Sequence, residues 1–168
     1  MRPFASVITM LMFALAALAP AQAADWQPFE PAGGGFQIEF PGKPTLKSED
    51  RRGRKIDTAL YAIDKSVAGA DLVFMVKYEA RSGDPGPDAP ATLEAVVKAM
   101  ASGNKLIADA ADEIDGFPAR EFTIQDADKD TYHVRVVITD RYFVQAMFLG
   151  PADNALGKQF LESFSVGK

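Results

Sequence analysis

The stretch TYHVRVVITDRYFVQAMFLG, residues 131–150, reads as two β-strands joined by a tight turn near Asp140. Valine, isoleucine, tyrosine and phenylalanine, which favour strands, dominate both halves. AREFTIQ, residues 119–125, is predicted to be a third strand, joined to this pair by a three-residue turn at Ala127–Lys129. Turns this short leave no room for a crossover, so neighbouring strands must run antiparallel. The stretch therefore predicts a β-meander.

Further strands are predicted upstream of this meander. Residues 105–114 precede it, before a turn at Asp115-Gly116. GGGFQIEFPGKP, residues 33–44, alternates apolar and polar side chains over 36–40 and is expected to begin the sheet. Residues 45–50 and 54–63 flank a hairpin tip at Arg52-Gly53. Residues 71–80 are apolar on both faces, so this strand is predicted to be central and covered on both sides.

Two segments carry helical periodicity instead. After a loop of proline, glycine and aspartate at 81–91, the residues Leu93, Val96, Val97 and Met100 follow the spacing i, i+3, i+4, i+7. Near the C-terminus an apolar stripe is formed by Leu156, Phe160, Leu161 and Phe164. The order of elements predicts an α+β fold, in which an antiparallel β-sheet is sandwiched by helices. Residues 24–168 are expected to form it as a single domain.

The first 23 residues are predicted to be a cleaved signal peptide. Arg2 precedes the uncharged apolar run 4–18, and the small residues Ala21 and Ala23 follow at the positions that a signal peptidase requires. We therefore expect a periplasmic or secreted protein, with no stable membrane anchor after cleavage.

Composition excludes several classes of function. The chain of 168 residues has 18 lysines and arginines against 23 acidic residues, a net charge of −5, which disfavours nucleic acid as a partner. It has no cysteine, so thiol catalysis and thiolate metal sites are excluded. No metal-binding spacing, glycine-rich phosphate loop or nucleophile–histidine pair is recognisable, and we predict no cofactor and no catalytic residues.

The single histidine lies in a polar cluster of the predicted sheet. The turn at Ala127–Lys129 would place Glu121 opposite Arg135 and Thr123 opposite His133. One interpretation is a partly solvated sheet face with a surface ion pair. The alternative is a polar binding floor made of Arg120, Glu121, His133 and Arg135.

Two charged turns are also candidates. The hairpin tip gathers the cations Arg51, Arg52, Arg54 and Lys55, which either protect an edge of the sheet or contact an acidic partner. Asp126, Asp128 and Asp130 resemble the start of a calcium loop, but Thr131 and Val137 stand where that loop needs glycine and glutamate. The carboxylates are therefore predicted to be turn formers.

FQIEFPGKP (36–44), IDGFPAREF (114–122), RVVITDRYFVQAMFLGP (135–151) and FLESF (160–164) together resemble bacterial exported domains of unassigned activity with the PsbP-like fold. The resemblance covers about residues 26–166. It implies an α/β/α sandwich with a β-hairpin before the first long strand, and a binding or assembly module. No functional residue is carried over by it.

Three functions stay open at this point. The first is a non-catalytic module that binds an unknown protein partner of the cell envelope, with the hairpin 50–55 and the loop 81–91 as contact regions. The second is a carrier of a small apolar ligand, lined by Phe74, Met75, Met147 and Phe148 between sheet and helix. The third and weakest is a hydrolase.

Overall fold

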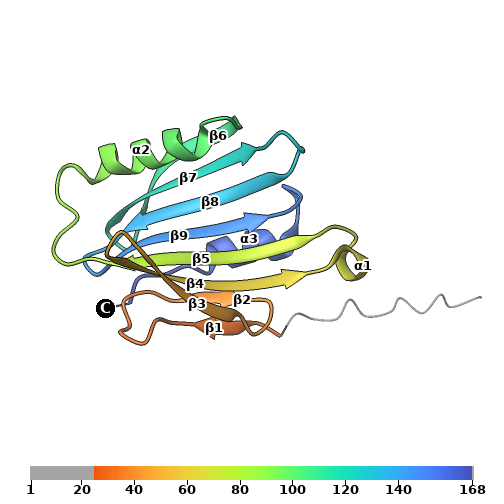
Figure 1. Cartoon of the computed structure of the whole chain (residues 1–168), viewed down its shortest axis with the longest axis horizontal. Helices are drawn as coiled ribbons and strands as arrows, with labels where there is room; N and C mark the ends of the chain where they lie inside the picture. Colours follow the sequence, from red (N-terminus) through yellow and green to blue (C-terminus); the bar gives the residue numbers. More distant parts are fainter. Residues whose placement is uncertain (1–24, 168) are drawn as a thin grey trace, which may run out of the picture.

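The computed structural model describes residues 25–167, so the predicted signal peptide lies outside the described residues. Seven strands form one antiparallel sheet in the order β3-β4-β5-β9-β8-β7-β6 (Figure 1). Their bounds are β3 Thr45–Arg51, β4 Arg54–Ile63, β5 Leu72–Ala80, β6 Lys105–Ile114, β7 Phe117–Gln125, β8 Thr131–Ile138 and β9 Tyr142–Leu149. The meander predicted from 105–150 is therefore present, and it forms one side of the sheet, with β9 in the middle.

The opening strand has a different place from the one predicted. β2 (Ile38–Phe40) pairs with β1 (Gln27–Phe29) in a separate two-stranded sheet, so it does not begin the large one. Its side chains Ile38 and Phe40 are fully buried against the large sheet. The apolar alternation over 36–40 thus serves a small hairpin that covers the sheet. This hairpin precedes the first long strand, as the PsbP-like resemblance implies.

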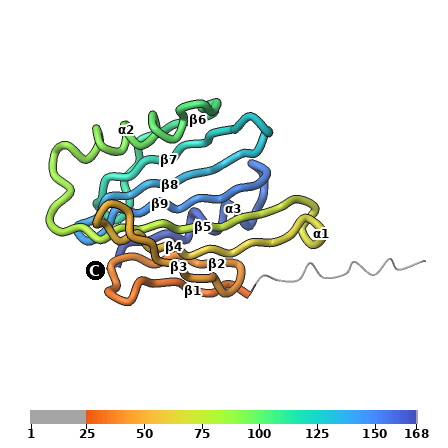
Figure 2. Tube along the Cα trace, viewed as in Figure 1, coloured from red at the N-terminus to blue at the C-terminus, as the bar shows by residue number. Residues whose placement is uncertain are grey.

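Three helices complete the described chain: α1 (Lys65–Ala68), α2 (Ala89–Ala101) and α3 (Ala155–Glu162). The tube in Figure 2 shows α2 near the β6–β7 edge and α3 behind the middle strands. α2 packs on β6, β7 and β8, whereas α3 packs on β9, β5 and β2. We call the two sides of the sheet the α2 face and the α3 face. The predicted α+β fold with helices on both faces is confirmed.

The α3 face holds the larger part of the core. Phe74, Val76, Ala146 and Phe148 of the sheet are buried there against Phe160 of α3 and against the β1–β2 hairpin. Aromatic rings make many of these contacts, for example Phe40 with Phe160 at 5.1 Å and Phe74 with Phe148 at 5.2 Å between ring centroids. Such edge-on and tilted aromatic pairs add about 0.5–1.5 kcal/mol each beyond area burial.

The α2 face is covered over only part of its width. Leu93 and Val97 of α2 are buried against Phe122, Val134 and neighbouring side chains of β7 and β8. A seven-stranded sheet is about 29 Å wide, since strands lie about 4.8 Å apart, whereas a helix with its side chains is about 10–12 Å across. One helix therefore leaves β3, β4, β5 and part of β9 uncovered on this face.

This coverage corrects the prediction for residues 71–80. β5 is flanked by β4 and β9, but it is covered on one side only. Leu72, Phe74 and Val76 are buried on the α3 face, while Val73 and Met75 on the α2 face are partly exposed. The apolar residues on the second face of β5 therefore belong to a surface and not to the core. None of the helices in residues 25–167 has the length and apolar character needed to cross a membrane.

Candidate binding surface

The uncovered part of the α2 face is organised in rows that cross the strands. One row is apolar, because Leu60 of β4 pairs with Met75 of β5, and Met75 pairs with Met147 of β9. Met75 and Leu60 belong to neither buried cluster, and Leu60 is 39% exposed. The neighbouring row is polar and contains Lys47, Thr58, Lys77 and Gln145 in register across β3, β4, β5 and β9. We call these two rows the open surface.

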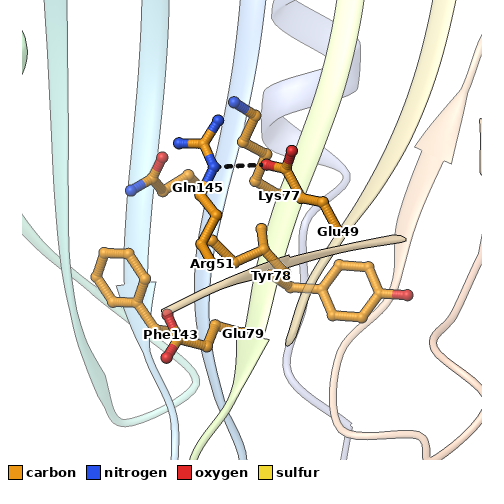
Figure 3. A pocket seen from close by; sticks show the side chains of 8 residues that line it. Glu49, Arg51, Lys77, Tyr78, Glu79, Phe143 and Gln145 are labelled. Carbon is orange, nitrogen blue, oxygen red and sulfur yellow. Dashed lines mark ion pairs between the residues drawn. The ribbon is translucent and has the colours of Figure 1, made fainter. Parts of the chain in front are cut away.

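The β3–β4 hairpin curls over one end of the open surface. Glu49 and Arg51 of β3 line a pocket of about 180 Å³ together with Lys77 of β5 and with Phe143 and Gln145 of β9. Figure 3 shows Glu49 and Arg51 reaching across β5 to the side chains of Lys77 and Gln145. Strands two and three places apart in the sheet thus contribute to one hollow, because the hairpin is strongly twisted.

The hairpin tip forms as predicted. Arg51 pairs with Arg54 across a two-residue turn, in which Arg52 has φ 56° and Gly53 has φ 78°. These positive φ values are those of a type I′ turn, which matches the twist of a hairpin.

The four cations of the tip do not form one patch. Arg51 contacts Glu49 at 3.0 Å and Arg54 contacts Glu79 at 3.3 Å, both on the α2 face. Lys55 lies on the α3 face and contacts Asp57 at 3.2 Å. Arg52 occupies the turn itself. Carboxylates therefore neutralise three of the predicted cations. Each of these ion pairs contributes little to the stability of the fold, because it lies at the surface.

The open surface nevertheless has a positive balance. Lys47 and Lys77 take part in no ion pair within residues 25–167, and they lie beside the paired Arg51 and Arg54. On a chain of net charge −5, this surface is a local exception.

The predicted polar cluster lies on the α3 face, outside the core. Glu121 pairs with Arg135, and Thr123 with His133, in the register expected from the turn length. Arg135 Nη2 lies 2.7 Å from Glu121 Oε2, and Arg135 Nη1 donates to the carbonyl of Leu161 in the last turn of α3. A cation at this position compensates the carbonyls at the helix end. Arg135 therefore ties α3 to β8.

Arg120 is not part of this cluster. It lies on the α2 face, because successive residues of a strand point to opposite sides. There its Nε and Nη2 bind both carboxylate oxygens of Asp109, each at 2.7 Å. This bidentate contact lowers the pKa of the Asp109 carboxyl. The predicted four-residue binding floor is thus wrong for Arg120, whereas Glu121, His133 and Arg135 lie together on the α3 face.

His133 is held by its neighbours Phe148 and Thr123. Its ring stacks on Phe148 at 5.9 Å, and its Nδ1 lies 3.2 Å from Thr123 Oγ1. Burial lowers the pKa of His133, against the opposing effects of Glu121 and the backbone at Gly150. His133 Nε2 and Arg135 Nε are buried without a hydrogen-bond partner. Both residues line a pocket of about 320 Å³ against α3.

The lining predicted for a carrier is divided between two faces. Phe74 and Phe148 are buried in the core of the α3 face, whereas Met75 and Met147 are partly exposed on the α2 face. They alternate along β5 and β9, so the four side chains cannot surround one ligand.

The aspartates at 126–130 act in the turn. Asp126 Oδ1 accepts from the backbone amides of Asp128 and Asp130, both at 3.0 Å. Asp126 Oδ2 accepts from the hydroxyl of Tyr132 at 3.1 Å. Within the described range, no group of three or more histidine, cysteine, aspartate or glutamate residues is placed to hold a metal ion.

Comparison with protein-family models gives no match, and no curated protein matches the chain. Among solved structures, the chain is similar to the solution structure of cyanobacterial PsbP (CyanoP) from Synechocystis sp. PCC 6803. The identity is 12%, the TM-score is 0.47, and the similarity covers 91% of this chain and 99% of that one. A PsbP protein is thus among the solved structures that are similar to this chain, as the resemblance in sequence predicts.

Two further solved structures are similar to the chain, and neither description names an enzymatic activity. One is PA94, a protein of unknown function from Pseudomonas aeruginosa, with 14% identity, a TM-score of 0.41 and coverage of 76% of this chain and 85% of that one. The other is from Bacteroides thetaiotaomicron, with 14% identity, a TM-score of 0.40 and coverage of 84% of this chain and 48% of that one. None of the three descriptions indicates a catalytic family. At these identities the likeness concerns the fold alone, so no residue role is taken from these proteins.

Sequence reasoning missed the open surface. Its signal was present in residues 71–80, where Val73, Met75 and Lys77 alternate with a buried set. A lysine in the middle of an apolar strand face indicates that this face meets water, since lysine is almost never fully buried.

Proposed function

We propose that the chain is an exported, non-catalytic binding module of the cell envelope, which holds a segment of another protein on the open surface. The observation that supports this function most directly is the partial coverage of the α2 face. Leu60, Met75 and Met147 form an apolar row there, where one helix leaves several strands without a covering layer. Exposed apolar surface rimmed by polar residues is typical of sites that bind other proteins.

The geometry favours contact by a chain segment over capture of a small molecule. The hollow that Arg51 lines with Phe143 and Gln145 is about 180 Å³, below the usual range of ligand pockets, roughly 300–1,000 Å³, and it adjoins a second hollow of about 350 Å³ that Arg51 lines with Leu60. The smaller hollow is one end of a broad surface that continues along β4 and β5 to Leu60. A ligand that lies along this surface would contact several strands at once.

The first test is site-specific photo-crosslinking in the cells that produce the protein. A photoreactive amino acid is placed at Leu60 or Met75, which lie on the open surface, and at Val67 of α1 as a matched control. Val67 is 75% exposed and lies outside the open surface. We expect one discrete crosslinked product from Leu60 and Met75 and none from Val67. The same product from all three positions, or no product from the first two, would contradict the proposal.

The predicted compartment is tested on the same cells. Fractionation should recover the protein outside the cytoplasm, and its intact mass should correspond to a chain that begins at Ala24. An unprocessed chain in the cytoplasmic fraction would refute export.

A further inference from the structure

The methionines of the described chain all lie on the side of the sheet where α2 packs. Met75 belongs to β5, Met147 to β9 and Met100 to α2. Met100 and Met147 pack against the buried cluster of the α2 face and are partly exposed, and Met75 stands directly opposite Met147. Methionine is unbranched and polarisable, so it adapts to irregular partners and is over-used at surfaces that bind amphipathic helices.

The uncovered part of this face has the width of a helix. At the row of Leu60, Met75 and Met147, away from the curled tip of the hairpin, β3, β4, β5 and β9 span three strand spacings, or about 14 Å, which accommodates a helix of about 10–12 Å in diameter. α2 already shows the mode of packing, since Leu93 and Val97, spaced i, i+4, are buried against β7 and β8. A second helix beside α2 would complete the layer over the apolar row of Leu60, Met75 and Met147.

The charges of the open surface indicate which side chains such a helix would carry beside its apolar stripe. Next to the apolar row, Lys47 and Lys77 stand in one cross-strand row and take part in no ion pair within the described chain. Arg51 and Arg54 follow toward the hairpin tip, and their partners Glu49 and Glu79 are the acidic residues nearby. The two unpaired ammonium groups favour carboxylates on the flank of the bound helix, because complementary charges give specificity and orientation.

From these observations we infer that the open surface is a groove for an acidic amphipathic helix of a partner protein. The apolar stripe of that helix packs on Leu60, Met75 and Met147, and its flanking carboxylates face Lys47 and Lys77. This inference rests on the proposed function and specifies the class of partner.

The test uses the full chain, labelled with [¹³C-methyl]methionine, and synthetic peptides of defined pattern. The resonances of Met75, Met100 and Met147 are assigned by replacing each in turn with leucine. The first peptide carries leucine at i, i+3, i+4 and i+7 with glutamate on the flanks. The second has lysine in place of each glutamate, and the third has the composition of the first with its leucines scrambled.

We expect the first peptide to shift the methyl signals of Met75 and Met147 in a saturable titration, and to bind at least tenfold more tightly than the other two. Lys47→Glu with Lys77→Glu should weaken binding of the first peptide by about tenfold and improve binding of the second, since a tenfold change corresponds to about 1.4 kcal/mol. Lys47→Gln with Lys77→Gln serves as the milder variant, and unchanged methyl dispersion shows that each variant is folded.

The outcomes separate the two proposals. Equal binding of the acidic and basic peptides, or no saturable shift of Met75 and Met147, overturns the inference about the acidic helix. Discrete crosslinks from Leu60 and Met75 would in that case still support a protein partner of another kind. If neither the crosslinks nor peptide binding is observed, both the proposed function and the inference about the acidic helix are refuted.

Discussion

At Gly157, α3 lies close against Phe148 of the sheet, and replacement of this glycine by alanine gives a sharp test of the packing. A Cβ atom at Gly157 would lie 2.2 Å from Phe148 Cε1, 2.3 Å from Cδ1 and 2.6 Å from Cζ. Real Cβ atoms are not found at such distances from carbon, so either the ring or the helix must move.

The ring of Phe148 can yield only toward the pocket of about 320 Å³ that it lines together with Gly157. It is 2% exposed, and it is held between Phe74 at 5.2 Å and His133 at 5.9 Å. Overpacking of a well-packed core costs about 1–3 kcal/mol. In the opposite direction, alanine stabilises a helix by up to about 1 kcal/mol relative to glycine. Because three ring atoms are involved, we expect the clash to prevail and Gly157→Ala to lose about 2 kcal/mol of unfolding free energy.

The assay is urea denaturation followed by tyrosine and tryptophan fluorescence, with the double variant Gly157→Ala, Phe148→Leu as control. Leucine removes the ring atoms that the new methyl group would meet, so alanine should be neutral or stabilising in that background. Together with the single variant Phe148→Leu, these proteins form a double-mutant cycle, which isolates the interaction free energy between residues 148 and 157. If Gly157→Ala alone is as stable as the parent chain, with an unchanged denaturant slope, α3 does not lie this close to β9.

Two further predictions concern charge. Burial lowers the pKa of His133 in the folded state below its ordinary 6.5, so protons bind preferentially to the unfolded chain, and stability should fall as the pH drops below 6.5 toward the folded pKa. His133→Gln should remove that part of the pH dependence in denaturation curves between pH 5.5 and 7, and an unchanged slope would show that the histidine is not responsible. Arg51→Glu with Arg54→Glu should change the unfolding free energy by no more than about 1 kcal/mol, since both ion pairs are well exposed; thermal unfolding measures it, and gross unfolding would show that the tip is structural.

Sequence patterns predicted the features that depend on neighbours along the chain. The length of the turn at Ala127–Lys129 determined that Glu121 faces Arg135 and that Thr123 faces His133, and the structure has this register. The type of turn at Arg52-Gly53 follows in the same way from the need for positive φ. Grouping Arg120 with Glu121 was wrong, although the alternation of a strand already places them on opposite sides.

Features that depend on distant parts of the chain were not accessible in this way. Phe36, Ile38 and Phe40 have the alternation of a strand, but nothing in that pattern shows that the strand pairs with residues 27–29 instead of 45–51. β1 is three residues long and contains Pro28, and α1 has four residues, so neither element gives a periodic signal. For β5, apolar residues on both faces led to a prediction of burial, because periodicity does not distinguish a core from a binding surface.

Successive side chains of β9 point to opposite faces of the sheet, and this links the packing on the two faces. Met147 and Phe148 are consecutive residues on opposite sides of the sheet. Met147 belongs to the open surface, whereas Phe148 contacts the ring of His133 and the helix that carries Gly157. A contact that displaces Met147 acts on the same short length of β9 backbone as the packing of α3 on Phe148. A shift of the β9 backbone at Met147 would therefore also move Phe148 and its contacts on the other side of the sheet.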